Sequence, residues 1–122
     1  MIEDLAREQI ENVGKKFETI AHCDHILLID KNGQIASHNF VDEQNAMNIR
    51  SVMRKAIMLT NKFSREGRFG KHKDIVLEGD FGKIMITNAP ISGYFIALIG
   101  SINMNSGMIH AMIEESGIKS VN

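Results

Sequence analysis

Apolar residues recur along the chain with two different periods, and each change of period marks a predicted element. A spacing of three or four positions predicts amphipathic helices over residues 2–20, 41–64 and 105–117. Shorter apolar runs between them predict strands at 26–29, 34–40, 73–80, 82–88 and 94–100. Asp42 is the expected N-cap of the second helix, and Asn32-Gly33 predicts a hairpin turn because both residues tolerate positive φ. The predicted order is α-β-β-α-β-β-β-α.

The two faces of each strand predict its place in the sheet. Residues 26–29 and 94–99 are apolar at every position, which is typical of central strands covered by helices on both sides. The runs at 34–40 and 73–78 mix polar with apolar residues, so we expect them at the edges. We therefore predict an α/β (α+β) fold, a five-stranded antiparallel sheet with its first and last strands in the middle and helices on both faces.

Length and composition predict one globular domain over residues 1–122. A chain of 122 residues with 43% hydrophobic and 24% charged residues is typical of this class. Its N-terminal stretch is charged from the third residue, so we expect no signal peptide, and no apolar run is long enough to span a membrane. The one cysteine, Cys23, cannot form an internal disulfide. These features favour a cytoplasmic protein.

Basic residues concentrate in one segment, although the net charge is only −1. Residues 50–73 hold eight basic residues against the single acid Glu66, so this segment carries +7 and the rest of the chain −8. A solvent-facing helix surface would explain the pattern, and so would a patch that steers an acidic partner. We do not expect a nucleic acid to bind, because Phe63 and Phe69 are the only aromatic residues of the segment and no recognition motif is present.

Several motifs spell a catalytic or metal-binding site without the spacing that the chemistry needs. In residues 22–25 (HCDH), neighbouring side chains diverge and cannot close a tetrahedral metal site. Residues 80–82 (DFG) lack the companion motifs of a kinase and predict a hairpin turn, and residues 67–71 lack phosphate-loop spacing. Surface positions without an evident carboxylate partner are expected for His38, His72 and His110. We predict no catalytic residue, metal, cofactor or small-molecule substrate.

Two features predict that a second chain completes the molecule. The strand at 74–78 lacks the prolines, glycine bulges and inward charges that protect a free sheet edge. The second helix is apolar over an arc of about 160°, which is broader than one sheet contact requires. The expected dimer interface consists of Ile49, Met53, Ala56, Ile57, Phe63, Asp74, Ile75, Val76, Leu77 and Glu78.

The charges of this edge strand predict where the two-fold axis of an antiparallel dimer passes. An axis at Val76 would set Asp74 opposite Glu78, which is unfavourable because both are acids. An axis at Ile75 sets Glu78 opposite His72 instead. We therefore predict that the axis passes at Ile75.

Four segments, in this order along the chain, resemble the Roadblock family, which is named for the dynein light chain: 26–37 (ILLIDKNGQIAS), 82–87 (GKIMIT), 92–99 (SGYFIALI) and 105–108 (NSGM). The resemblance covers essentially the whole chain. It implies a profilin-like Roadblock fold, and a homodimer or heterodimer in which the third strands pair into a ten-stranded sheet with the second helices side by side. Members of the family are non-catalytic as single chains. They regulate or scaffold small Ras-like GTPases, in some cases stimulating hydrolysis, and others adapt cargo to dynein.

The resemblance leads to a functional hypothesis, a dimeric platform that docks a small Ras-like GTPase on its paired second helices. The expected outward-facing docking residues are Met47, Arg50, Arg54 and Met58. We expect the two arginines to be docking contacts rather than an arginine finger, because arginines on helices usually serve that purpose. Two alternatives stay open: a small-molecule sensory domain with an internal cavity, and an obligate subunit of a larger enzyme complex.

Overall fold

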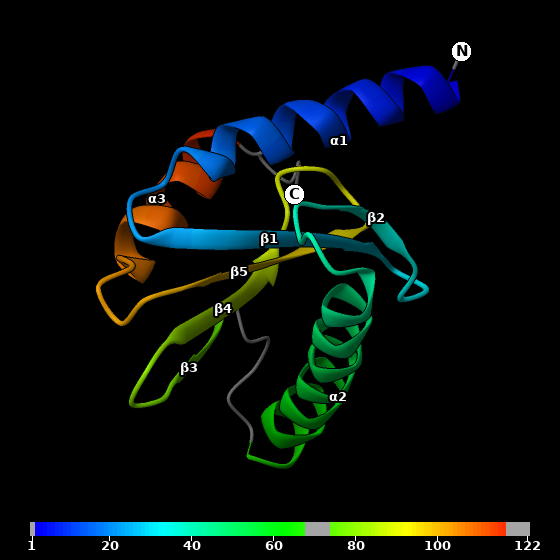
Figure 1. Ribbon diagram of the computed structural model, residues 1–122. Helices are drawn as coiled ribbons and strands as arrows, with labels where there is room; N and C mark the ends of the chain where they lie inside the picture. Colours follow the sequence, from blue (N-terminus) through cyan, green and yellow to red (C-terminus); the bar gives the residue numbers. More distant parts are fainter. Residues whose placement is uncertain (1, 68–73, 117–122) are drawn as a thin grey trace.

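The computed structural model describes residues 2–67 and 74–116, and its eight elements follow the predicted order (Figure 1). The helices are α1 (Ile2–Glu18), α2 (Glu43–Glu66) and α3 (Ser106–Ser116). The strands are β1 (Cys23–Asp30), β2 (Ile35–His38), β3 (Asp74–Glu78), β4 (Lys83–Asn88) and β5 (Tyr94–Gly100). None of the helices in these ranges is both long enough and apolar enough to cross a membrane.

The strands form one antiparallel sheet in the order β2-β1-β5-β4-β3. The first and last strands of the chain lie next to each other near the middle, with Leu27 opposite Ala97. β2 and β3 are the two edges. The prediction of a five-stranded antiparallel sheet with this arrangement is confirmed. The two strands that are apolar on both faces lie in the middle because both of their faces need cover.

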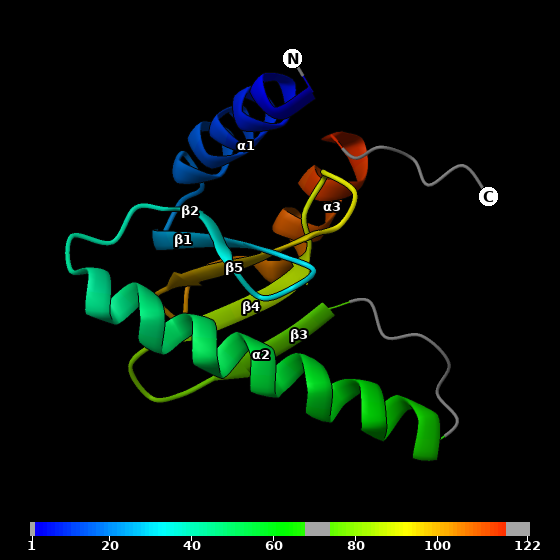
Figure 2. The ribbon, with the colours of Figure 1, turned by 90° about the vertical axis from the view of Figure 1, so that its right-hand side faces the viewer.

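Helices cover both faces of the sheet, with α1 and α3 on one face and α2 on the other (Figure 2). Successive residues of β1 point to opposite faces, so Ile26 and Leu28 pack with Phe17 and Ile109 beneath α1 and α3. Leu27 and Ile29 pack on the other face, in a second cluster with Ala46, Met53, Ile86 and Ala97. The sheet therefore separates two cores, and within residues 2–67 and 74–116 α2 is the one helix that covers the second core.

The hairpin between β1 and β2 forms as predicted, but through a different turn. Gly33 has φ of +83°, whereas Asn32 does not have a positive φ. The Asp30 carboxylate accepts hydrogen bonds from the backbone N–H groups of Asn32 (2.8 Å) and Gln34 (3.0 Å), and the Gly33 N–H donates to the Asp30 carbonyl (2.9 Å). This is a three-residue loop with a left-handed glycine, which is a common hairpin connection.

The ends of α2 follow local chemistry. Asp42 is the N-cap as predicted, and its carboxylate accepts a hydrogen bond of 2.8 Å from the Gln44 N–H. The helix begins at Glu43 rather than at Val41, whose side chain is fully exposed. At the other end, the Gly67 N–H donates to the Phe63 carbonyl. The helix therefore ends at Glu66, two residues beyond its predicted end at residue 64.

Candidate protein-interaction surface

Strand β3 forms one edge of the sheet, and in the described ranges its only neighbouring strand is β4. Ile75 packs against the core beneath α2. Leu77 lies opposite Ile84 and points to this same face, yet its side chain is 49% exposed. Val76 points to the opposite face and is 42% exposed. The edge strand thus keeps apolar side chains in solvent on both faces, which a protected edge avoids.

Both acids of β3 have cationic or hydrogen-bonding partners within the chain. Asp74 lies 2.7 Å from His110 Nδ1, and its carboxylate accepts a hydrogen bond of 2.6 Å from the Thr87 hydroxyl. Glu78 forms an ion pair of 3.1 Å with Lys83. These contacts weaken the charge argument for a dimer axis at Ile75, because an axis at Val76 would bring together two carboxylates that are already paired.

Two of the histidines expected to stand alone have carboxylate partners. His110 lies between Asp74 and Glu114, with its Nε2 atom 2.8 Å from the Glu114 carboxylate. His38 Nε2 lies 3.1 Å from the Glu43 carboxylate, across the β2–α2 connection. The expectation is therefore wrong for both. Only the fold brings Asp74 to His110, because the two are far apart in sequence. Glu114 and Glu43, in contrast, lie only four and five residues from their histidines. His72 lies outside the described residues.

One face of α2 packs on its own sheet and is closed to a partner. Ala46 and Met53 are fully buried there, and Ile49, Ala56 and Ile57 are partly buried against the same core. A fully buried side chain cannot also contact a second chain without a rearrangement. Met53 therefore does not fit the predicted dimer interface. Ile49, Ala56 and Ile57 could contribute only the exposed parts of their side chains.

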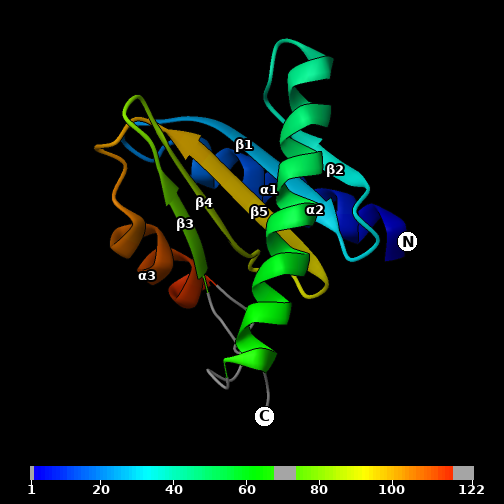
Figure 3. The ribbon, with the colours of Figure 1, turned by 90° about the horizontal axis from the view of Figure 1, so that it is seen from below.

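A second side of α2 faces the β3 edge and carries exposed apolar residues. Val52, Leu59 and Phe63 fall on one side of a helix with 3.6 residues per turn, and their side chains are 44%, 70% and 63% exposed. This side is turned away from the β1–β2 hairpin, and Figure 3 shows that hairpin and β3 on opposite sides of α2. Of these residues, only Phe63 is in the predicted interface. The other two could have been found by separating the broad apolar arc into two sides.

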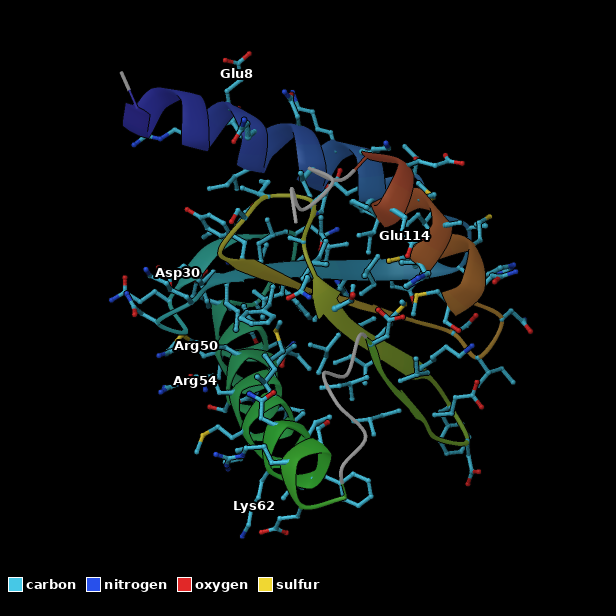
Figure 4. All side chains as sticks on the ribbon, turned by 180° about the vertical axis from the view of Figure 1, so that it is seen from behind. Glu8, Asp30, Arg50, Arg54, Lys62 and Glu114 are labelled. Atoms are coloured by element: carbon cyan, nitrogen blue, oxygen red, sulfur yellow. The ribbon has the colours of Figure 1, made fainter. Side chains whose placement is uncertain are left out.

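The third side of α2 contacts the β1–β2 turn and holds the predicted docking residues. Arg50 is half-buried, and its Nε donates a hydrogen bond to the Gly33 carbonyl. Arg54 is exposed, and its side chain runs across the same glycine. A Cβ atom added at Gly33 would lie only 2.8 Å from the Cδ and Nε atoms of Arg54. Figure 4 shows both arginines near Asp30. The turn is thereby held against the helix.

Met58 completes this third side next to a surface groove. Its side chain is 70% exposed, and that of Met47, about three turns earlier, is 40% exposed. The groove, of about 180 Å³, lies between the β1–β2 turn, Arg54, Met58 and Phe95. Small-molecule pockets usually have volumes of ~300–1,000 Å³, so this groove is better suited to one or two side chains of another protein.

The basic segment is only partly described, but its described half lies on α2. Lys55, Lys62 and Arg65 are exposed in addition to Arg54. Arg68, Lys71 and Lys73 lie outside the described residues. The described part gives the outer surface of the helix a positive field, as expected of a patch that attracts acidic partners.

Residues 22–25 have neither the geometry of a metal site nor that of a nucleophile. Asp24 is exposed, and His25 stacks on Phe40 with ring centroids 4.4 Å apart. In residues 2–67 and 74–116, no group of three His, Cys, Asp or Glu side chains is placed to bind a metal. Burial, and secondly the neighbouring Asp24 carboxylate, raise the pKa of the Cys23 thiol. A raised pKa opposes thiolate formation and hence nucleophilic chemistry.

Comparison with known proteins identifies the family of the chain. The sequence profile of the Roadblock/LC7 domain matches residues 9–99, and no curated protein matches the chain. The fold is similar to a Roadblock/LC7 domain from Streptomyces avermitilis, with a TM-score of 0.68 and 18% identity over 81% of this chain and 85% of that one. It is also similar to Myxococcus xanthus MglB (TM-score 0.74, 16% identity, 90% and 83% covered) and to MglB in a tetrameric arrangement (0.72, 12%, 89% and 82%). Because the profile spans most of the sequence, the chain belongs to the Roadblock/LC7 domain family.

Proposed function

We propose that this protein is a non-catalytic dimeric platform that binds a small Ras-like GTPase. The observation that carries the proposal is that apolar side chains are exposed both on one side of α2 (Val52, Leu59 and Phe63) and on β3, an edge strand whose only strand neighbour among the described residues is β4. Exposed apolar surfaces of this kind mark protein-interaction sites. Membership of the Roadblock/LC7 domain family supports a regulatory or scaffolding role rather than catalysis.

In the proposed dimer, the β3 strands of two copies pair antiparallel and extend the sheet to ten strands. The backbone groups on the outer side of β3 would gain hydrogen-bond partners, and the Val52 side of α2 would face the other copy. The tetrameric arrangement of the similar protein MglB supports assembly through this fold. A homodimer is the simplest form, and a heterodimer with a related chain would use the same edge.

The GTPase would dock on the third side of α2, which remains exposed in such a dimer. Met47 and Met58 offer adaptable apolar contacts, and Arg54 adds positive charge for an acidic partner surface. Arg50 has a supporting role, because its guanidinium holds the β1–β2 turn. We propose tethering or regulation through contact, with neither arginine entering the nucleotide site.

The dimer is tested first, by sedimentation equilibrium of the purified chain and of the Val76→Lys variant. Val76 lies at or next to the two-fold axis, so the substitution sets two ammonium groups close together across the new strand pair. We expect a dimer that this variant converts to a monomer. Val41→Lys is the matched control, because Val41 is equally apolar, fully exposed and outside the sheet. A chain that is monomeric at all concentrations would contradict the proposal.

The docking surface is tested with a purified Ras-like GTPase from the same organism, loaded with GDP or with a non-hydrolysable GTP analogue. Binding is measured by interferometry for the unmodified chain and for Arg54→Glu and Met58→Lys. We expect nucleotide-dependent binding that each substitution weakens about tenfold or more, as for central contacts of an interface. Lys15→Glu, an equal charge reversal on α1, should bind normally. Binding that is unaffected by both α2 variants would move the docking site elsewhere.

A further inference from the structure

We propose that the β3–β4 turn (residues 79–82) is a second, reciprocal contact of the homodimer, in which Phe81 and Asp80 of each copy dock on the C-terminal half of α2 in the other. The proposal rests on the dimer described above and names a contact that edge pairing alone does not require. The contact joins two surfaces. One is the β3–β4 turn, which is apolar and acidic, and the other is the C-terminal half of α2, which is apolar and basic.

The hairpin end presents its apolar side chains on a firm base. Phe81 is 98% exposed, and Leu77 on the adjoining strand is 49% exposed on the face that α2 covers. The Gly79 N–H donates to the Gly82 carbonyl (2.8 Å), which closes the turn. Lys83 then fixes its base, by an ion pair with Glu78 and a hydrogen bond of 2.8 Å to the Met104 carbonyl. Because the base of the turn is held in this way, its backbone loses little conformational freedom on binding.

The helix end offers a matching apolar surface that the chain's own sheet does not cover. Leu59 is 70% exposed and Phe63 is 63% exposed, and both lie on the side of α2 that faces the β3 edge. α2 covers β3 near the start of the strand, where Ile75 joins the core, and leaves Leu77 uncovered near its end. Each chain therefore has apolar side chains that are about half or more exposed at the end of β3 and at the end of α2.

A two-fold axis through β3 brings these two ends together. Figures 2 and 3 show the C-terminal end of α2 on the side of the beginning of β3, and the β3–β4 turn at the other end of the strand. In Figure 1 this turn reaches the side of the sheet on which α2 lies. Rotation by 180° about an axis that is perpendicular to the sheet and passes beside the middle of β3 sets the beginning of one β3 strand next to the end of the other. The helix end of the second copy then lies over the turn of the first.

The charges at the two ends are complementary. Glu78 and Asp80 are exposed at the hairpin end. Lys55 and Lys62 border Leu59 and Phe63 on α2, and both lysines are exposed. Glu66, the last residue of α2, is the one acid in this half of the helix. Opposite charges around an apolar centre are typical of a specific interface. In a symmetric dimer each contact occurs twice, which doubles its contribution to the free energy of dimerisation.

The experiment measures the dissociation constant of the dimer by dilution of fluorescently labelled chain, with circular dichroism as a check of folding. Phe81→Ser should weaken the dimer about 100-fold, because two buried aromatic contacts are lost. Asp80→Lys and Lys62→Asp should each weaken it about tenfold, the scale of two exposed pairs replaced by repulsion. The double variant Asp80→Lys/Lys62→Asp restores both pairs with reversed sign and should recover most of the affinity.

Two matched controls separate this contact from general effects of hydrophobicity and net charge. Val41→Ser removes another fully exposed apolar side chain, and Glu8→Lys reverses an exposed acid on α1. Both should leave the dissociation constant unchanged. If the unmodified chain is a monomer, the proposed function fails. If Val76→Lys abolishes the dimer while the turn variants change its affinity less than twofold, only the reciprocal contact is overturned.

Discussion

Two glycines show how single residues fix the approach of elements in this fold. Gly14 is buried in α1, and a Cβ there would lie 3.6 Å from Ile26 Cδ1 and 3.9 Å from the Ser37 hydroxyl, both ordinary contact distances. Gly100 ends β5 against the start of β1, and a Cβ there would overlap the His22 carbonyl oxygen. His22 itself has φ of +66°, so the backbone at this crossing is already constrained.

The same substitution should therefore have opposite effects at the two positions. Gly14→Ala is expected to stabilise the protein by about 0.5–1 kcal/mol, because alanine favours the helix and finds room. Gly100→Ala is expected to destabilise it by about 1–3 kcal/mol, since backbone must move to admit the methyl group. Urea unfolding of both variants at one protein concentration measures the two values. Equal and small changes in the free energy of unfolding would contradict the inference that position 14 has room for a methyl group and position 100 does not.

Cys23 should react slowly with alkylating reagents at neutral pH. Its half-buried thiol has a raised pKa, so a smaller fraction is thiolate than in a free cysteine. The rate with iodoacetamide should still be rising at pH values where that of free cysteine has levelled off. The urea-unfolded chain is the control and should react like free cysteine. A native rate as high as the unfolded rate at neutral pH would refute the effect of burial.

At the scale of elements, His110 ties helix α3 to the edge strand. Its two ring nitrogens lie 2.7 Å from the Asp74 carboxylate and 2.8 Å from that of Glu114. Carboxylates only accept hydrogen bonds, and an imidazolium ring can donate to both, whereas a neutral ring donates to one. The link fixes the beginning of β3, next to the start of the proposed strand pair.

Removal of this link should loosen the edge strand locally. His110→Ala is expected to destabilise the protein by about 0.5–1.5 kcal/mol, a modest value because both side chains are partly exposed. Amide hydrogen exchange should accelerate in β3 more than in β1 or β5. Glu114→Gln, which removes only the more exposed partner within α3, should leave β3 exchange unchanged. Uniform acceleration across the sheet would mean that the link has no local role.

Most elements were predictable because their signals are local. Strand order followed from the runs 26–29 and 94–99, which are apolar on both faces, and the Asp42 cap followed from its side chain. The β1–β2 turn differed because the sequence Asn32-Gly33 permits more than one hairpin loop. The Asp30 carboxylate selects the loop with one left-handed residue by accepting two backbone N–H groups.

The candidate surface was harder to predict because it depends on which side of a helix meets its own sheet. The apolar arc of α2 is broad, and sequence spacing alone did not separate Met53, which is buried, from Leu59, which is exposed. Arg50 likewise gave no sign of its contact with the Gly33 carbonyl, 17 residues away. The contact of Asp74 with His110 also needs the complete fold.

At the scale of the whole molecule, the two cores differ in how completely helices shield them from solvent. Among the described helices, α1 and α3 cover one face of the sheet and α2 covers the other (Figures 2 and 3). Apolar side chains of α2 and β3 remain exposed on the α2 side. The surface left open is the one through which we propose assembly. Dimerisation would thus complete the half of the molecule that one chain does not close.

The central pairing of β1 with β5 has a consequence for synthesis. Leu27 meets Ala97, so the strand that belongs beside β1 is made only after most of the chain has been translated. A nascent polypeptide that ends before residue 94 lacks this strand and leaves the apolar run 26–29 without its main neighbour. Emergence of residues 94–100, rather than of the first hairpin, is then the step at which the sheet can close, and chaperones would protect the chain until that moment.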